Sequence, residues 1–280
     1  MSKIEWTEQT YNPIIGCSKI SEGCRNCYAE KMAGRLANIP ATEDYYKQVV
    51  EWDVDSEGLP VKPAKWNGQT ALVESALDKL LHRKKPTVYF VCSMGDLFHE
   101  ATPFSWIERV LEIMKDCPQH IFLVLTKRPK MAEEYVRGWA ARTGEWPFPE
   151  NMYIGVTAEN QKTADERIPW LGRLRPNRTF VSIEPMLEQI QLYDRYRVPG
   201  YPEKGRTAGA MHLMGVADQI IVGGESGANA RPMHPDWVRS IRDQCIIPGT
   251  PFYFKQWGKF IPADQEDCPV GPPIKDWVYS

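Results

Sequence analysis

The sequence predicts an α/β fold: a parallel β/α barrel, partial or closed, of about six to seven strands. Three observations support this. Short apolar, β-branched segments recur along the chain, their starts lie 27 to 41 residues apart, and helical stretches usually follow them. That spacing is typical of repeated βα units. Nearly continuous apolar strands are also what a parallel sheet covered on both faces requires.

The expected strands begin near the N-terminus. The first lies in TYNPIIGC, residues 10–17, directly before a cysteine-rich loop. The others are expected within 87–96, 120–129, 151–160, 178–185, 219–227 and 251–258. A doubly wound open sheet is the alternative architecture, because the same βα rhythm builds both.

Helical periodicity appears between these strands. Ile107, Val110, Leu111 and Met114 recur at i, i+3, i+4 and i+7, which predicts an amphipathic helix. A second stripe consists of Trp237 or Val238, Ile241 and Cys245. We therefore expect helices around 107–114 and 237–245.

The chain is expected to form one domain, 1–280, with two insertions. Residues 40–70 are an irregular insertion after the first helix, and residues 188–217 are a Gly-, Tyr- and Arg-containing loop between strands. Long excursions of this kind are often lids or substrate loops.

Composition limits the class of protein. The 280 residues are 42% hydrophobic, and the longest apolar runs, such as IFLVL, fall far short of the roughly 20 residues of a membrane span. The start MSKIEWTEQT has no apolar leader segment, so we expect a cytoplasmic protein with reduced thiols and no membrane partner. Seven cysteines, an odd number, fit poorly with a complete disulfide framework. The net charge of -2 argues against a general electrostatic grip on nucleic acid, but leaves room for a local basic cleft.

Polar or glycine residues follow each predicted strand. Since parallel β/α folds bind ligands at the carboxyl ends of their strands, we expect these residues to line a site. The candidates for cofactor binding are Met94, Gly95, Asp96, Thr157, Glu159, Asn160, Glu184, Gly223, Gly224, Glu225 and Ser226. Any one of them could instead be a helix cap or turn residue.

Four cations near these strand ends are candidates for binding a substrate carboxylate or phosphate. They are Lys127, Arg128, Arg231 and Lys255. The alternative for each is an ordinary surface salt bridge.

The segment GCSKISEGCRNCYAEK places Cys17, Cys24 and Cys27 within eleven residues. Buried structural thiols are one interpretation, but a Gly- and Ser-containing loop is not a core pattern. A zinc site would need a fourth ligand, and a redox Cys-x-x-Cys pair would leave Cys17 unexplained. The fourth interpretation is a 4Fe-4S cluster held by three thiolates, which leaves one iron open to a small molecule such as S-adenosylmethionine (SAM).

Several segments resemble a family of phage and prophage proteins described mainly as a domain of unknown function with a three-cysteine motif. They are WTEQTYNPIIGCSKISEGCRNCYAEKMAGR, GVTAENQKTADERIPWL, VSIEPML and GGESGANARPMHPDWVRSIRDQC with PFYFKQWG. That family is similar in turn to the radical-SAM barrels. The resemblance implies Cys17, Cys24 and Cys27 as cluster ligands and Met94, Gly95 and Asp96 at the position of a SAM-amine motif.

The resemblance also implies a reaction: reductive cleavage of SAM to modify or repair a phage-relevant substrate, with a nucleic-acid component as one candidate. Its partners would be SAM and an electron donor such as flavodoxin or ferredoxin. Two features depart from the radical-SAM pattern. The first cysteine gap is six residues rather than three, and Asn26 precedes the third cysteine where an aromatic residue is usual. The alternative function is a metal-stapled binding module, with an iron–sulfur cluster or zinc, that performs no turnover.

Overall fold

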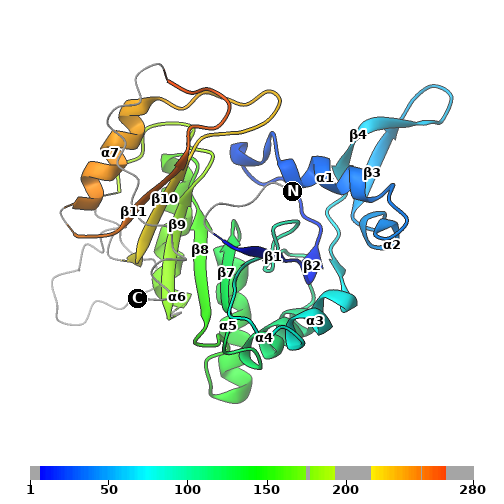
Figure 1. The fold of residues 1–280 in the computed structure, drawn as a ribbon, viewed down its shortest axis with the longest axis horizontal. Helices are drawn as coiled ribbons and strands as arrows, with labels where there is room; N and C mark the ends of the chain where they lie inside the picture. Colours follow the sequence, from blue (N-terminus) through cyan, green and yellow to red (C-terminus); the bar gives the residue numbers. More distant parts are fainter. Residues whose placement is uncertain (1–6, 175–176, 193–215, 247, 263–280) are drawn as a thin grey trace. The chain divides into compact units, whose positions relative to one another are not determined.

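The computed structural model describes residues 7–174, 177–192, 216–246 and 248–262. The chain divides into two compact units, Met1–Met152 and Tyr153–Ser280. Figure 1 labels the elements of both. Each unit is a βα structure with its own site residues, and each is described by itself below.

Unit 1 contains three parallel strands in the order β1-β6-β7. They are β1 (Gln9–Tyr11), β6 (Val88–Val91) and β7 (Ile121–Thr126). The helices of this unit include α3 (Glu74–Leu81), α4 (Phe104–Lys115) and α5 (Pro129–Thr143). The four apolar residues predicted to form a stripe, from Ile107 to Met114, are the buried residues of α4. The first predicted helix is therefore confirmed.

Unit 2 contains parallel strands in the order β8-β9-β10-β11. They are β8 (Met152–Thr157, whose first residue closes unit 1), β9 (Arg178–Ile183), β10 (Gln219–Gly223) and β11 (Phe252–Gln256). Helix α6 (Gln161–Leu174) follows β8, and α7 (Pro235–Ile246) follows β10. Of the predicted second stripe, Val238, Ile241 and Cys245 are buried in α7.

Every segment predicted to be a strand overlaps one of these seven parallel strands, and all but the first contain it whole. The predicted fold class, an α/β barrel type with about six to seven parallel strands, is confirmed. The carboxyl ends of β6 and β7 in unit 1, and of β8 to β11 in unit 2, carry the candidate site residues.

The prediction that residues 40–70 are irregular is wrong. This segment forms α2 (Glu43–Tyr46) and an antiparallel hairpin of β3 (Val50–Val54) and β4 (Pro60–Trp66). The Oδ1 atom of Asp55 accepts hydrogen bonds from the backbone N–H groups of Glu57 and Leu59, and Gly58 has a φ of +79°. This turn chemistry is what a hairpin loop needs, and its signal in the sequence is the short Asp-Ser-Glu-Gly segment. Most of the other predicted insertion, 188–217, lies outside the described residues.

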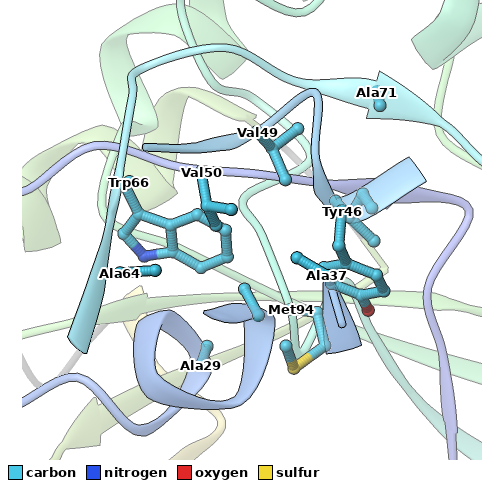
Figure 2. Packing of buried hydrophobic residues seen from close by; sticks show 11 residues of the cluster. Ala29, Ala37, Tyr46, Val49, Val50, Ala64, Trp66, Ala71 and Met94 are labelled. Carbon is cyan, nitrogen blue, oxygen red and sulfur yellow. The ribbon is translucent and has the colours of Figure 1, made fainter. Parts of the chain in front are cut away.

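The hairpin lies beside α1 (Tyr28–Leu36) in Figure 1, and the two share a hydrophobic cluster. Figure 2 shows Trp66 and Val50 of the hairpin with Ala29 and Ala37 from the helix segment and Met94 from the segment after β6. Cys17 and Cys27 pack against this cluster. Burying apolar side chains against α1 stabilises the support of the cysteine loop by about 25 cal/mol per Å² of apolar surface removed from water.

A short antiparallel pair completes the frame of the loop in unit 1. Strand β2 (Ile14–Ile15) pairs with β5 (Ala71–Leu72), and Ile14 and Ile15 are buried. Cys17 therefore follows a fixed strand with one residue between them.

Among the described residues, no helix has both the length and the apolar character that crossing a membrane requires.

Candidate functional site

The cysteine loop of unit 1 runs from the end of β2 to the start of α1. A 3-10 helix, η1 (Glu22–Cys24), holds Cys24, and Cys27 is the N-cap residue of α1. The Cys24 N–H donates to the carbonyl of Ser21 at 3.0 Å, and the Cys27 N–H donates to the carbonyl of Cys24 at 3.4 Å. These two backbone hydrogen bonds hold the turn that joins Cys24 to the start of α1.

Charged groups and thiols around Cys17 shift its pKa. The pKa of Cys17 is raised to about 12, mainly by burial and then by the charge of Asp96, while the Arg128 guanidinium lowers it. Cys27 and Cys24 raise it further, so both thiols lie within electrostatic reach of Cys17. Within the described segments, however, no three His, Cys, Asp or Glu side chains are gathered as they would be around a single metal ion.

Cys92 belongs to a different environment from these three. It is buried directly after β6 with a φ of +55°. Burial raises the pKa of Tyr11, and the nearby Cys92 raises it further. Burial raises the pKa of Cys92 itself, which is opposed by a hydrogen bond with the backbone of Ile14. The thiol therefore fills a core position beside Tyr11 and Ile14.

The donor set of the loop fits an iron–sulfur cluster. Cluster ligands are soft thiolates, and the loop supplies three of them. Half-buried Cys17 is protonated on its own, so a cationic metal centre is the kind of ligand that would draw off its proton. Arg128 places an N–H donor 3.6 Å from the Cys17 sulfur.

Asp96 is 4% exposed and is connected to the cysteine loop through Arg128. Its Oδ1 atom accepts from the Thr126 hydroxyl at 2.8 Å and from the Phe98 N–H at 3.1 Å. Its Oδ2 atom accepts from the Lys127 N–H at 3.0 Å and from Arg128 Nη1 at 3.2 Å. The carboxylate therefore joins the segment after β6 to the end of β7.

Arg128 is also 4% exposed, and its guanidinium donates in three directions. Nε donates to Glu100 Oε2 at 2.6 Å, and Nη1 contacts Cys17 and Asp96. Nη2 donates to the carbonyl and the hydroxyl of Ser18, at 3.0 and 2.8 Å. The cation expected from sequence to meet a substrate is thus bound to the cysteine loop, and its role in substrate binding stays a prediction.

His99 supports the same loop residue. Its Nδ1 atom accepts from the Ala101 N–H at 3.1 Å, which places the ring proton on Nε2, 2.9 Å from the Ser18 hydroxyl oxygen. Burial lowers the pKa of His99, and Arg128 lowers it further. A neutral His99 therefore donates to Ser18 and does not act as a base toward it.

The Met94–Gly95 backbone is used to hold the loop. The Gly16 N–H donates to the Met94 carbonyl at 3.0 Å, and the Met94 N–H donates to Asn12 Oδ1 at 3.1 Å. A Cβ on Gly95 would lie 2.9 Å from the Gly16 carbonyl oxygen, closer than real Cβ contacts come. Gly95 is required here for the approach of two backbones, and the Met94 side chain is buried in the cluster of Figure 2.

Unit 2 has its own group of ionised side chains at the ends of β9 and β11. Lys255 Nζ donates to both oxygens of Glu184, at 2.7 and 2.9 Å, and Gln256 Nε2 lies 3.4 Å from Oε1. A Cβ on Gly223 would come within 3.1 Å of the Glu184 carboxyl carbon. The half-buried pair and Gly223 thus form one compact arrangement.

A second pair follows β10. Arg231 donates from its backbone N–H and Nε to Glu225 Oε2, both at 2.8 Å, and from Nη2 to Oε1 at 2.6 Å. A Cβ on Gly224 would lie 2.0 Å from the Trp257 carbonyl oxygen, so Gly224 permits two chain segments to cross. Ser226 is exposed beside this pair.

The residues after β8 have identifiable structural partners. Asn160 caps α6, because its Oδ1 accepts from the Thr163 N–H at 2.9 Å. Arg167 Nη1 donates to the Thr157 carbonyl at 2.9 Å and to Glu159 Oε2 at 2.7 Å, where Glu159 is fully buried. Asn160 is therefore a helix cap, as the alternative interpretation expected, and Glu159 is one member of a buried ion pair. Their part in binding a cofactor stays a prediction.

The structure brings Met94, Gly95, Asp96, Lys127 and Arg128 together around the cysteine loop in unit 1. Sequence reasoning missed Ser18, His99 and Glu100, which complete this group. A usable signal was present: Ser18 adjoins Cys17, and the polar residues of GDLFHE lie in the segment after β6, beginning at Gly95.

Comparisons with known proteins give one family and one solved structure. The model of a family described as "Protein of unknown function (DUF5131)" matches residues 1–271. No curated protein matches. Among solved structures, a mutant of spore photoproduct lyase is similar at 9% identity and a TM-score of 0.42, covering 96% of this chain and 68% of that chain.

Proposed function

Since the chain belongs to the DUF5131 family, whose description assigns no activity, we propose a function from the site itself. The protein holds a 4Fe-4S cluster with Cys17, Cys24 and Cys27, binds SAM at the open iron, and acts as a radical-SAM-like enzyme. Its substrate is phage-relevant, and a nucleic-acid component is the first class to test.

The cysteine loop carries this proposal. Two thiols of the same loop, Cys24 and Cys27, lie within electrostatic reach of Cys17, and the buried Arg128 guanidinium donates toward the Cys17 sulfur. Structural core thiols such as Cys92 show neither feature. Three protein thiolates leave one iron of a cubane cluster for an external ligand.

When bound and reduced by an external donor, the cluster would supply one electron to the SAM sulfonium and so release a 5'-deoxyadenosyl radical. The residues of the chain have separate tasks. The three cysteines hold the cluster, and Cys27 does so from the N-cap position of α1. The hydrophobic cluster around Met94 and Trp66 excludes water from one side of the loop.

The remaining cofactor and substrate assignments rest on the chemistry of the strand ends. Glu184, Glu225 and Ser226 can accept hydrogen bonds from an amine or from ribose hydroxyls. Lys127, Arg231 and Lys255 are cations suited to a phosphate or carboxylate. The paired states of Lys255 and Arg231 are compatible with this, because an anionic ligand competes with Glu184 and Glu225 for them.

The proposal also requires an electron donor, such as flavodoxin or ferredoxin, and a reducing compartment such as the bacterial cytoplasm. The phage setting belongs to the same proposal. The odd number of cysteines supports a chain whose thiols stay reduced.

Anaerobic purification followed by iron, sulfide and zinc analysis tests the cofactor. We expect a brown protein with about four irons and four sulfides per chain, whose absorption bleaches with dithionite. The reduced protein is then incubated with SAM, and 5'-deoxyadenosine is measured. Cys24→Ala is the control, and it should yield neither iron nor 5'-deoxyadenosine.

A colourless protein with one zinc per chain would overturn the cluster. An intact cluster that yields no 5'-deoxyadenosine would instead favour the second candidate, a metal-stapled binding module without turnover. One observation supports that candidate: Arg128, Arg231 and Lys255 all contact carboxylates of their own unit.

A further inference from the structure

We infer that Arg128, held by Asp96, is the positioning residue that fixes Cys17 and the start of the long cysteine gap for cluster binding. This inference rests on the proposed function. It assigns the two residues to the frame of the site, in place of substrate binding for Arg128 and cofactor binding for Asp96.

The contacts of Arg128 carry the first step. Its side chain is 2% exposed, and Nε, Nη1 and Nη2 donate to Glu100, to Asp96 and Cys17, and to Ser18. A planar guanidinium can make such a fork of bonds in fixed directions, whereas an ammonium cannot. Arg128 therefore determines the position of Cys17 relative to the end of β7.

Asp96 carries the second step. An ionised carboxylate offers about four acceptor positions, and four donors already occupy those of Asp96. This leaves no acceptor for the amine of SAM. The Asp96 carboxylate anchors Arg128. Its other three donors are the backbone N–H groups of Phe98 and Lys127 and the hydroxyl of Thr126, and these fix the position of the carboxylate.

The six-residue gap between Cys17 and Cys24 is held at both of its first two residues, Ser18 and Lys19. Arg128 and His99 hold Ser18 at the beginning of the gap. Lys19 Nζ contacts Glu30 Oε2 at 2.6 Å, and Glu30 Oε1 accepts from the backbone N–H of Trp66. The extra residues are thus tied to the sheet and to α1, so a longer gap can still present Cys17 in one position.

The Arg128 N–H donor near the Cys17 sulfur should also affect the reduction potential of a bound cluster. Nη1 of Arg128 lies 3.6 Å from Cys17 Sγ. Hydrogen bonds to ligand sulfurs and nearby positive charge raise the reduction potential of iron–sulfur clusters. A purely structural residue would not shift that potential.

The first test uses the metal-free protein. In Arg128→Lys, charge balance with Asp96 is kept but the fork is lost. We expect amide hydrogen exchange in residues 16–24 to become several-fold faster, with little change in β7. The matched control is Arg109→Lys, which alters an exposed bidentate pair with Glu74 on α3 and α4. Asp96→Asn should reproduce the effect, and the double variant should be no worse than either single one, because both act through one unit.

The second test uses the reconstituted protein. Loss of the residues that orient metal ligands typically weakens metal binding 10- to 100-fold, so iron should pass to a chelator about 10 to 100 times faster from Arg128→Lys than from wild type. Arg128→Gln, which removes charge and donor together, should shift the cluster potential to a more negative value.

Unchanged loop exchange in both Arg128→Lys and Asp96→Asn would overturn the inference, as would unchanged iron loss and potential. A wild-type protein that binds no iron would overturn the proposed function instead. The exchange experiment on the metal-free protein still decides whether Arg128 fixes the loop.

Discussion

Charged residues at the strand ends are mostly engaged with one another. Asp96 and Arg128 in unit 1, and Glu159 and Arg167 in unit 2, are buried ion pairs. Removing one member of such a pair leaves an uncompensated buried charge, which is far more costly than losing a surface pair. Substitutions at these positions therefore report on stability as well as on function.

The three loop cysteines should behave as one set. Replacing Cys17, Cys24 or Cys27 by Ala should each abolish iron binding, measured after anaerobic reconstitution. Cys92→Ala, Cys117→Ala and Cys245→Ala should retain iron, because their buried thiols belong to core positions. Loss of iron in Cys92→Ala alone would mean four protein ligands and no open iron.

Glu159→Gln should destabilise the protein by about 3 to 5 kcal/mol, because Arg167 loses its buried partner. Thermal or urea denaturation measures this. Glu74→Gln, in the exposed pair with Arg109, should change stability little. If Glu159 also binds SAM, titration of SAM into the anaerobic variant will show weaker affinity with an unchanged cluster spectrum. Unaltered affinity would remove Glu159 from the cofactor site.

At the scale of elements, the β3–β4 hairpin supports the cysteine loop through α1. Trp66 is the last residue of β4, and its side chain is buried in the shared cluster. Its backbone N–H donates to Glu30 Oε1 of α1. The cysteine loop therefore depends on the β3–β4 hairpin, which begins about 25 residues after the last loop cysteines in the sequence. The residues of β3, VEWDV, alternate apolar and acidic side chains, and an Asp-x-x-Gly turn follows them. The sequence therefore carried a hairpin signal here, in a segment much shorter than the βα repeats.

Two glycines give opposite expectations. Gly58→Ala should destabilise the hairpin by about 1 to 2 kcal/mol, because φ of +79° is left-handed. Gly138→Ala, at an exposed position inside α5 with open space around it, should stabilise the protein by about 1 kcal/mol. Denaturation curves and hydrogen exchange of residues 50–66 measure both effects. Faster exchange of the hairpin in Gly138→Ala would contradict the local assignment.

At the scale of the whole molecule, buried histidines should make the fold acid-sensitive. Burial lowers the pKa of His120 below 6.5, and the ring is fully buried beside Tyr89 and Phe122. His99 shifts in the same direction. As the pH falls below about 6.5, the unfolded chain binds the proton first, so stability is full above that pH and declines below it.

Melting temperatures measured between about pH 5 and 8 should therefore fall toward the acid side. His120→Phe keeps an aromatic ring among Tyr89 and Phe122 and removes one titrating group. Its melting temperature should depend less steeply on pH than that of wild type. An identical slope would show that His120 does not contribute.

Much of the site was visible in the chain order alone. The three cysteines are local in sequence, and Asp96 and Arg128 each follow an apolar strand, so strand-end reasoning placed them at one edge of a sheet. It could not show that Asp96 faces Arg128 and that Arg128 faces Ser18. Those contacts join residues 32 and 110 positions apart, and pairing at such separations depends on strand register and side-chain direction.

The sequence by itself determined the βα rhythm, the buried stripes of α4 and α7 and the grouping of the three cysteines, because each depends on spacing within a short segment. Only the tertiary structure decided which charged side chains pair with each other and which backbone contacts require a glycine. Gly95 and Gly224 sit where two backbones meet, and Asp96 is filled by four donors. The physical reason is that burial makes an unpaired charge or a missing hydrogen bond costly, so the fold selects partners that no local pattern records.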